Sequence, residues 1–431
     1  MRVLQAAHAL PPDTYGGVEL YTVGLSEALA ARGHDVAVAA PGGGADLDVT
    51  TFDLPTPDPP DVQADRGLPT GPVNPAVDGR FDDLLASFDP DVVHLQHFKG
   101  LSAAIPALCA ERGVACVATL HDFWTICHRE QLHRPDGSRC SGPESVEKCT
   151  DCYLAAESDE SAIADGGAGS AGEPRLGADA DGGRTGETGA TRREQYATVV
   201  TARTALLRTA LGATDVLVSP SSFLRDRFVA HGTPPGDVVQ LRNGIRVDRF
   251  VDTGFEGAPV RFGYAGRITP EKGVHLLVEA FDELDGDATL DVFGRFASGE
   301  DPYHADLAEA AGERVRFRGF YDDPAAPYRA MDVLVLPSIW YENSPLVIQE
   351  ARAAGLPVVT ADVGGMAELV TDGVDGLTFP VGDAAALAGA LSGLVDDATA
   401  VERLRAGVEP PTRLDEHAAA VEALYADCAS A

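Results

Sequence analysis

Short apolar runs rich in Val and Leu alternate with longer stretches of helical composition from the first residues of the chain. Four of these runs come early, at residues 3–7, 35–40, 91–96 and 114–120. The connection between two parallel strands needs a dozen or more residues and is usually a helix. Runs that are apolar throughout are typical of strands covered on both faces. The pattern therefore predicts the α/β class, with a parallel sheet between layers of helices.

A second series of the same kind follows the turn-forming pair Asn243-Gly244. Its apolar runs lie at residues 260–265, 289–293, 315–318, 332–337 and 357–360. A chain of 431 residues exceeds the usual upper size of one hydrophobic core. We predict two Rossmann-like domains, residues 1–243 and 244–410, that face an interdomain cleft and bind ligand at the carboxyl ends of their strands. A helix within residues 411–431 is expected to pack back on the first domain.

One segment interrupts the first domain. From about residue 157 to 193 the chain consists mostly of Gly, Ala, Asp, Glu and Ser, with almost nothing to bury. Such a composition does not offset the entropy lost on folding, so we predict a disordered insertion. A helix at 196–211 and strands at 215–219 and 238–241 then complete the domain.

The charge of the chain is strongly acidic, with 67 acidic and 33 basic side chains and a formal net charge of -34. This balance repels phosphate backbones, so nucleic acid is not expected as a partner, while a peripheral membrane contact stays open. Three of the basic residues are lysines, Lys99, Lys148 and Lys272. An acidic, lysine-poor surface suits molar salt, where the Debye length is about 3 Å, and we expect a halophilic source. An acidic mesophilic protein would explain the charge but not the scarcity of lysine.

The start of the chain runs directly into the apolar run at residues 3–7, with no basic segment before an apolar one. No secretory signal is therefore expected. No stretch approaches the 18 apolar residues of a membrane-spanning helix. These features predict a cytoplasmic protein.

Residues 337–350 are the most informative segment of the second half. Ser344 is a suitable N-cap and Pro345 a suitable first residue for a helix that would run to about residue 354. The free amides at such a helix start bind a diphosphate or sugar oxygens. Glu342 and Glu350 lie about two helical turns apart, so they suit two points of one elongated ligand, such as the sugar and the ribose of a nucleotide sugar. The alternative is an ordinary helix cap followed by a solvated glutamate.

A second segment, at residues 263–273, favours the ligand-binding interpretation. It places Gly266, Arg267 and Lys272 between the end of a strand and the start of a helix. Cations in that place hold a departing diphosphate without a metal. Lys272 is also one of three lysines on a chain that otherwise uses arginine.

Four motifs together carry a resemblance to a known family. They are YENSPLVIQEARAAGLPVV, AGRITPEKG, LRNGIRVDRF and VGGMAELV. In combination they resemble the retaining glycosyltransferase family 4 of the GT-B fold, over nearly the whole chain except the insertion. The resemblance implies that Arg267 and Lys272 hold the donor diphosphate, that Glu350 holds the ribose and that Glu342 holds the transferred sugar.

The first domain carries its own candidates. A loop at residues 8–17 ends in Gly16-Gly17 and lacks the GxGxxG spacing of a dinucleotide fold, which argues against an NAD enzyme. The resemblance implies that this glycine pair approaches the donor phosphates and that His121, at the end of a strand, lies near the donor sugar. A plain loop and a structural histidine are the alternatives, and His94 and His97 are interpreted as structural.

The resemblance thus gives two sets of candidate residues. The catalytic set is His121, Arg267, Lys272 and Glu342. The donor-binding set is Gly16, Gly17, Gly266, Arg267, Lys272, Asn343, Ser344, Pro345, Leu346 and Glu350.

The implied reaction moves a hexose from a nucleotide diphosphate sugar to a hydroxyl of an unidentified glycan, lipid or small-molecule acceptor, with retention of configuration. The leaving phosphate oxygen takes the proton of the acceptor, so no protein nucleophile and no catalytic cofactor are expected. Polysaccharide biosynthesis is the expected setting. The alternatives are a sugar-nucleotide epimerase of the same fold and a non-catalytic subunit that binds a sugar nucleotide.

Four of the seven cysteines fall within residues 127–152, at Cys127, Cys140, Cys149 and Cys152. The last two form a Cys-x-x-Cys pair in a segment rich in Gly and Pro. In a cytoplasmic protein this spacing favours a structural zinc ion over disulfides. Reduced thiols and a redox pair are the alternatives.

Overall fold

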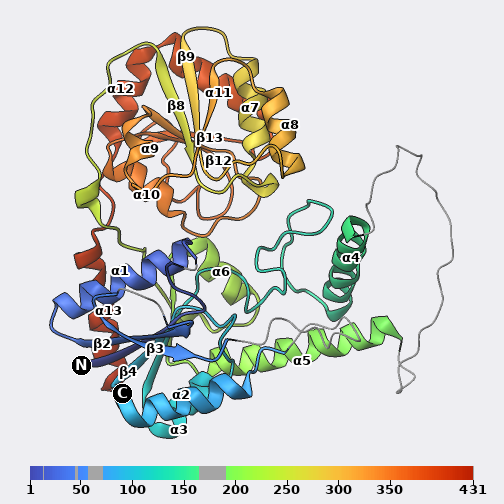
Figure 1. Ribbon diagram of the computed structural model, residues 1–431, viewed down its shortest axis with the longest axis vertical. Helices are drawn as coiled ribbons and strands as arrows, with labels where there is room; N and C mark the ends of the chain where they lie inside the picture. Colours follow the sequence, from blue (N-terminus) through green and yellow to red (C-terminus); the bar gives the residue numbers. More distant parts are fainter. Residues whose placement is uncertain (13, 44–46, 57–70, 165–190, 431) are drawn as a thin grey trace.

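The computed structural model describes residues 1–12, 14–43, 47–56, 71–164 and 191–430. Two lobes lie one above the other in Figure 1, each built on one parallel sheet with helices on its faces. The first half of the chain forms the lower lobe and residues from about 250 to 410 form the upper one.

The sheet of the first domain has the strand order β3-β2-β1-β4-β5-β6-β7. Every neighbouring pair in it is parallel. Its strands are β1 (Arg2–Ala6), β2 (Asp35–Pro41), β3 (Thr50–Leu54), β4 (Val92–Leu95), β5 (Ala115–Thr119), β6 (Val216–Ser219) and β7 (Val238–Gln240). Its helices are α1 (Gly17–Ala31), α2 (Pro75–Phe88), α3 (Ile105–Arg112), α4 (Val146–Ala164), α5 (Arg192–Gly212) and α6 (Ser222–Ala230).

The sheet of the second domain has the order β10-β9-β8-β11-β12-β13 and is also parallel. Its strands are β8 (Val260–Ala265), β9 (Ala288–Phe293), β10 (Val315–Gly319), β11 (Val333–Leu336), β12 (Val358–Ala361) and β13 (Gly376–Phe379). Its helices are α7 (Val274–Asp282), α8 (Pro302–Ala310), α9 (Ala326–Arg329), α10 (Leu346–Ala353), α11 (Ala384–Asp396) and α12 (Ala398–Gly407).

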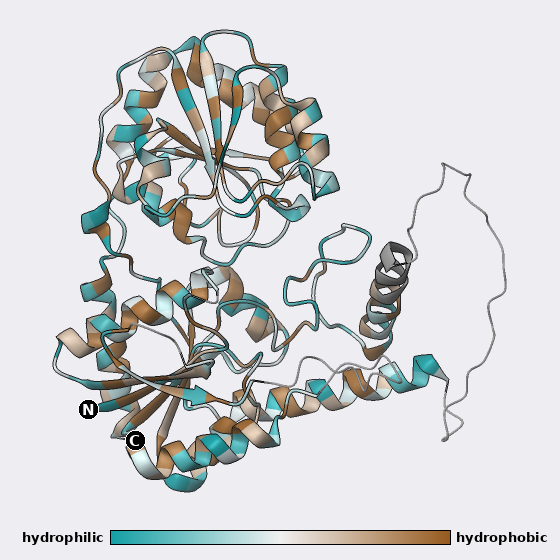
Figure 2. Cartoon of the chain, in the orientation of Figure 1, coloured by the Kyte–Doolittle hydropathy of each residue, from teal (hydrophilic) through white to brown (hydrophobic). Residues whose placement is uncertain are grey.

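The apolar strands form the centre of both lobes, and Figure 2 shows them largely in brown. Strands β4 and β11 are buried at every position, which requires helices on both faces of each sheet. One large cluster of buried side chains fills the second domain, while two smaller clusters lie on the two faces of the first sheet. The continuous apolar runs of the sequence are thus explained by double-sided burial.

The chain crosses between the domains twice, and the crossings touch. Ile245 pairs with Arg413, and the Leu414 amide donates to the Ile245 carbonyl oxygen at 2.9 Å. After the second crossing, α13 (Leu414–Ala429) packs on α1 and joins the core of the first domain through Val421 and Tyr425. Figure 1 shows α13 beside α1 in the lower lobe.

The prediction of an α/β protein with two parallel sheets is confirmed, but several elements differ from the expected bounds. Strands β3 and β13 were not predicted. Both are short edge strands, and polar or small residues such as Thr50 and Gly376 interrupt their apolar pattern.

The expected insertion at about 157–193 lies mainly outside the described residues. At its borders the prediction is wrong, because α4 continues to Ala164 and α5 begins at Arg192. The early start of α5 has a local cause. Thr191 and Glu194 form a reciprocal capping box there, which satisfies two of the free amides at the helix start.

No single helix in the described part of the chain is long and apolar enough to cross a membrane. Helices α11 and α12 reach that length and composition only as a pair bent by 100°.

Candidate functional site

The carboxyl ends of the two sheets face each other across the domain boundary. Asn343, in the loop after β11, donates from Nδ2 to the carbonyl oxygens of Leu120 and His121, just after β5, at 3.2 and 3.0 Å. Its Oδ1 accepts from the Ser221 hydroxyl at 2.6 Å. A Cβ added to Gly17, at the start of α1, would lie 3.8 Å from the Leu346 side chain at the start of α10. Predicted site residues from both domains therefore meet at this boundary.

Glu342 is the centre of the densest polar group at the boundary. Its Oε1 accepts from Lys272 Nζ at 2.5 Å, from Trp340 Nε1 at 2.9 Å and from Ser338 Oγ at 3.0 Å. Lys272 Nζ also lies over the Trp340 ring, 5.0 Å from its centroid. Three donors thus hold one carboxylate oxygen, while Oε2 has no bonded partner within the described part of the chain. That second oxygen is the one able to accept from a ligand hydroxyl.

The ion pair keeps Glu342 ionised although it is nearly buried. The side chains of Glu342 and Lys272 are 13% and 17% exposed. Burial alone would raise the pKa of Glu342, but the charge of Lys272 and the donated hydrogen bonds outweigh it and hold that pKa below its usual value. The site therefore offers an anionic acceptor next to a cation, in a place with little water.

Lys272 owes its position to a tight turn. It ends the short 3-10 helix Pro270–Lys272, and the next residue, Gly273, has φ +69°. A Cβ on Gly273 would lie 2.1 Å from the Pro337 carbonyl oxygen, so only glycine lets this turn approach the end of β11. The Ile339 amide, which donates to the Glu271 carbonyl oxygen at 3.0 Å, joins the two segments.

Glu350 lies on α10 and makes a separate contact. Its Oε2 accepts from the buried Tyr328 hydroxyl at 2.5 Å. Burial raises the pKa of Glu350, and the Tyr328 hydrogen bond and the nearby Arg249 charge oppose this only in part. Glu342 and Glu350 are therefore two chemically different carboxyl groups, one paired with a lysine and one with a phenol.

The start of α10 differs from the expected cap. The helix begins at Leu346 with Pro345 at the N-cap, and no side chain caps it. The prediction that Ser344 is the N-cap is wrong by one position. Its hydroxyl is buried and has no hydrogen-bond partner among the described residues. The first amides of the helix have no acceptor inside the helix, so this end presents unpaired donors beside Gly17.

Arg267 follows β8 and is exposed, with no ion pair within the described residues. Its carbonyl oxygen accepts from the Tyr264 hydroxyl at 2.5 Å, which fixes the backbone here. The preceding Gly266 has φ +149°, a conformation that side-chain residues rarely adopt. The guanidinium is thus free to meet an anion, while its backbone is held.

The loop after β12 closes on the segment that carries Glu342. The Gly365 amide donates to the Glu342 carbonyl oxygen at 2.7 Å. A Cβ on Gly365 would lie 1.4 Å from the Asn343 carbonyl oxygen, so this approach requires glycine. Three residues further on, Glu368 accepts from the amides of Ser222, at 2.9 Å, and Phe223. A carboxylate of the second domain therefore caps α6 of the first.

His121 lies at one end of a buried chain of hydrogen bonds that leads to α13. Its Nε2 bonds to Gln96 Oε1 at 3.0 Å, Gln96 donates to Gln5 Oε1 at 2.6 Å, and Gln5 donates to the Tyr425 hydroxyl at 3.2 Å. Tyr425 in turn bonds to His94 Nδ1 at 2.6 Å. A carbonyl oxygen only accepts, so His121 carries its hydrogen on Nε2 and a lone pair on Nδ1.

The protonation of His121 follows from this setting. Burial, supported by the nearby His97, lowers the pKa of His121 to about 3. The ring is therefore neutral near pH 7, and its Nδ1 is an acceptor. His94 is fully buried in the same chain and, as interpreted from the sequence, structural.

Two contacts between a histidine and a carboxylate beside His121 were not predicted from the sequence. His8 Nε2 lies 3.2 Å from Glu19 Oε1, and His97 Nε2 lies 2.9 Å from Asp122 Oδ2. Burial would raise the pKa of Glu19, but the contacts with His8 hold it at about 2. The available signal was positional. His8, His97 and Asp122 each follow the end of a strand, where side chains of parallel sheets converge.

The four clustered cysteines lie apart from this site, in the loop after β5 and the first turns of α4. They line one cavity together with His128 and His133, and all seven cysteines of the chain are free thiols. Burial, with the neighbouring thiols, raises the pKa of Cys149 and Cys152 to about 11. As placed, no three His, Cys, Asp or Glu side chains in the described ranges stand close enough together to hold a metal ion.

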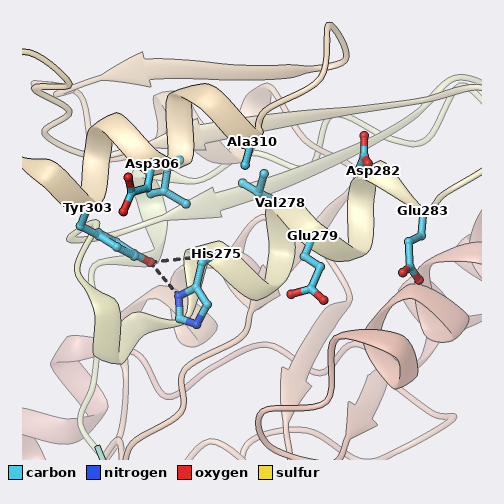
Figure 3. A pocket seen from close by; sticks show the side chains of 9 residues that line it. His275, Val278, Glu279, Asp282, Glu283, Tyr303, Asp306 and Ala310 are labelled. Carbon is cyan, nitrogen blue, oxygen red and sulfur yellow. Dashed lines mark hydrogen bonds between the residues drawn. The ribbon is translucent and has the colours of Figure 1, made fainter. Parts of the chain in front are cut away.

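A surface cavity of about 560 Å³ lies elsewhere, between α7 and α8 (Figure 3). None of the predicted site residues lines it. Four carboxylates do, from Glu279, Asp282, Glu283 and Asp306. They would repel a diphosphate, so this cavity is a poor place for a nucleotide.

Two family models match the chain, one in each domain. The model described as Glycosyltransferase Family 4 matches residues 15–141, and the one described as Glycosyl transferases group 1 matches residues 259–397.

Curated relatives include a phosphatidyl-myo-inositol mannosyltransferase of Mycobacterium leprae, 35% identical over 190 residues, which is 42% of this chain and 50% of that protein. A 2-deoxystreptamine glucosyltransferase of Streptomyces kanamyceticus is 35% identical over 234 residues, 52% of this chain and 57% of that protein. The chain spans about half the length of the curated relatives it matches.

Solved structures match over nearly the whole chain. Anabaena HepE, in complex with UDP and glucose, covers 99% of this chain and 100% of its own, with a TM-score of 0.66 and 16% identity. Sucrose-phosphate synthase from Thermosynechococcus elongatus covers 99% and 98%, with a TM-score of 0.67 and 19% identity. At this identity the likeness concerns the fold, and the prediction of the GT-B fold is confirmed.

Proposed function

The chain belongs to the family 4 glycosyltransferases, and from that membership we propose that it moves a hexose from a nucleotide diphosphate sugar to a hydroxyl acceptor with retention of configuration. The observation that carries the proposal is the group of Lys272, Trp340 and Glu342 at the facing ends of the two sheets. A cation and an oriented carboxylate stand there beside the open amides of α10. A diphosphate and a sugar hydroxyl are the two ligand groups that such neighbours recognise.

Each residue has a role in this proposal. Lys272 and the exposed Arg267, with the amides that begin α10 at Leu346, bind the diphosphate and stabilise the charge that grows as it leaves. Gly16 and Gly17 let the backbone of the first domain come close to the same phosphates. Glu342 accepts from a sugar hydroxyl through its free Oε2.

The other candidates orient the donor. Glu350 accepts from the ribose hydroxyls once Tyr328 shares or releases it. His121 accepts from a sugar hydroxyl through Nδ1. The side chain of Asn343 is occupied by Leu120, His121 and Ser221, so its contribution to the donor would come from its backbone.

Retention is proposed from the family membership, and a step without a covalent enzyme intermediate is proposed because Glu342 is a poor nucleophile. Lys272, Trp340 and Ser338 stabilise its negative charge, which lowers its reactivity toward carbon. In the proposed step the bond between the anomeric carbon and the phosphate oxygen breaks. The acceptor oxygen forms its bond on the same face, and its proton moves to the leaving phosphate oxygen. Orientation and charge stabilisation then supply the rate, without a metal.

The donor nucleotide and the setting are proposed more broadly. HepE has been solved in complex with UDP-glucose, which supports a nucleoside diphosphate sugar as the donor here. The names of several relatives describe transfer to inositol lipids, 2-deoxystreptamine or inositol phosphate, so polyols and glycans are the proposed acceptor class. A cytoplasmic setting in polysaccharide biosynthesis is proposed with them, since seven free thiols suit a reducing compartment.

Turnover of a panel of UDP-, GDP- and ADP-sugars, followed by proton and phosphorus NMR in molar KCl with polyol and glycan acceptors, tests the proposal. We expect one donor to lose its anomeric signal while the nucleoside diphosphate and a product with the same anomeric configuration appear. Lys272→Met should abolish this, and Arg403→Met, at an exposed site on α12, should not.

Two results would instead favour the alternatives. A new stereoisomer of the sugar nucleotide without release of nucleoside diphosphate would indicate an epimerase. Binding of a donor that stays intact with every acceptor would indicate a binding subunit.

A further inference from the structure

We propose that Cys127, Cys140, Cys149 and Cys152 hold a structural zinc ion that fastens the loop between β5 and α4. The proposal is independent of the transfer reaction, because it concerns a cavity with none of the donor-site residues in its lining. Four thiols of one chain segment face that single cavity. A sulfur-only set of four is the donor set of closed structural zinc sites.

The arrangement of the four thiols along the chain supports one site. Cys149 and Cys152 are three residues apart on α4, so they lie on one face of the helix. Cys127 and Cys140 come from the preceding loop, on either side of the small bridge between His133 and Arg139. The Cys149-x-x-Cys152 spacing is that of one ligand pair of a structural zinc site, and Cys127 and Cys140 would supply the other two ligands.

Two buried histidines at the same cavity are a second observation. His128 Nε2 and His133 Nε2 are buried without any hydrogen-bond partner in the described part of the chain. Such orphaned polar atoms are costly unless something polar occupies the space beside them. A cation with its thiolates is such an occupant, and either histidine is also a chemically suitable ligand.

The donors have to move inward to bind. As the chain is placed, no three of them are close enough to coordinate one ion, so the ion itself would draw them together. The loop between β5 and α4 can adjust to bring the thiols together, because it contains turns but no helix or strand. Zinc binding would replace the thiol protons and thereby supply free energy that this loop lacks.

A zinc ion in this loop would also affect the interdomain boundary, because the loop packs against it. Arg139 lies over the Tyr341 ring at 5.8 Å, and Phe123 meets the same ring edge-on at 6.4 Å. Tyr341 directly precedes Glu342. The zinc-held loop would therefore stiffen the wall against which the segment carrying Glu342 packs.

The test is the metal content of protein purified without chelator or histidine tag, by mass spectrometry. We expect about one zinc per chain in the parent and in the Cys428→Ser control on α13, and less than about a tenth of that in Cys149→Ser/Cys152→Ser. The parent stripped of metal should bind cobalt, with the thiolate charge-transfer and tetrahedral d–d bands that a sulfur-rich site gives. The cobalt experiment needs no variant, so a failure of the double variant to fold leaves the question decidable.

The proposal would be overturned by parent protein that carries no metal, binds no cobalt and keeps all four thiols of the cluster free. A disulfide between two of these cysteines in freshly purified protein would also overturn it. Neither result bears on sugar transfer, which is measured separately with nucleotide sugars.

Discussion

Glu342 shows how a single side chain divides its two oxygens between structure and ligand. Oε1 is filled by Lys272, Trp340 and Ser338, whereas Oε2 is left for an incoming hydroxyl. Because the lysine and the indole are fixed relative to each other, the carboxylate is oriented before any ligand arrives. Orientation of this kind is what lets a charged group contribute to catalysis without reorganisation.

Trp340→Phe tests whether the donors to Oε1 orient Glu342 for a ligand at Oε2. It keeps a ring beneath Lys272 but removes the Nε1 donor from Glu342, so that two donors instead of three orient the carboxylate. We expect kcat/KM to fall about tenfold, which corresponds to the loss of one hydrogen bond to a charged group. Nucleoside diphosphate binding should stay within about twofold of the parent value. Unchanged kcat/KM in a variant that is fully folded by circular dichroism would contradict the role assigned to Trp340.

The buried chain from His121 to Tyr425 gives a second prediction at this scale. Tyr425→Phe removes the hydroxyl that Gln5 and His94 share, which lets Gln5, Gln96 and the His121 ring reorient. We expect kcat to fall several-fold with little change in the KM for the donor. The nitrogen NMR shifts of His121 should also show a mixture of tautomers. Tyr303→Phe, at a hydroxyl bonded to His275 on α7, is the matched control.

A structural role alone would predict a different result for Tyr425→Phe. It would lower the stability and leave both the kinetics and the His121 tautomer of the folded protein unchanged. That outcome would remove α13 from the account of the site.

At the residue scale, the sequence predicted which charged residues belong to the site but not which of them pair with each other. Lys272 and Glu342 were predicted for one ligand, but their direct ion pair was not, because they are separated by 70 residues. The pairs of Glu19 with His8 and of Asp122 with His97 were missed, because their positions after strand ends indicate that side chains converge but not which of them pair.

At the scale of elements, the domain boundary is held by helix ends. Asn343 ties the loop after β11 to the end of β5, and Glu368 accepts from the first amides of α6. Both contacts join loops at the carboxyl ends of strands. The start of a helix favours anionic groups, and at α6 the anionic group is the Glu368 carboxylate of the other domain.

Glu368→Gln should weaken the closed arrangement of the domains. The amide keeps one acceptor oxygen but loses the charge that favours the α6 terminus. We expect the radius of gyration in X-ray scattering to rise and the KM for the donor to increase several-fold. Glu402→Gln, at an exposed site on α12, controls for the change in net charge. Identical scattering and KM for the two variants would contradict a closing role for Glu368.

The sequence predicted the central strands of both sheets and missed two of the four edge strands. The bounds of β8 agree with the apolar run at residues 260–265, because five of its six residues are buried. The edge strands β3 and β13 carry mixed residues and gave no such signal. At α10 the residues Ser344 and Pro345 both suit a helix start, and local propensity could not tell which of them is the N-cap.

On the scale of the whole molecule, charge and burial act in opposite directions as the pH falls. The formal net charge of -34 diminishes as carboxylates protonate, while buried histidines resist protonation in the folded state. Burial lowers the pKa of His94 to about 3 and that of His417 to about 4. The expectation of a halophilic source stays a prediction, and it makes molar KCl the reference condition.

These two histidines predict a loss of stability in acid. The unfolded chain takes up a proton on each of them near pH 6.5, and the folded chain does so only near pH 3 to 4. Their contribution is therefore complete above pH 6.5 and is lost as the pH falls toward 4. Each adds a slope of about 1.4 kcal/mol per pH unit to the free energy of unfolding. The free energy of unfolding can be measured with urea in 2 M KCl between pH 4 and 6.5. Its dependence on pH should be weaker in His94→Gln than in the parent, by the uptake of about one proton on unfolding. The same pH dependence in both proteins would contradict this.

The most direct test of the central claim, a nucleotide-sugar site at the facing sheet ends, is calorimetric titration with UDP, GDP and ADP in molar KCl. The parent, Glu350→Ala and the exposed control Glu402→Ala would be compared. The account predicts that one nucleotide binds the parent and the control alike and binds Glu350→Ala at least about tenfold more weakly, a loss of about 1.4 kcal/mol. Binding of none of the three nucleotides, or equal binding by Glu350→Ala and the parent, would contradict it.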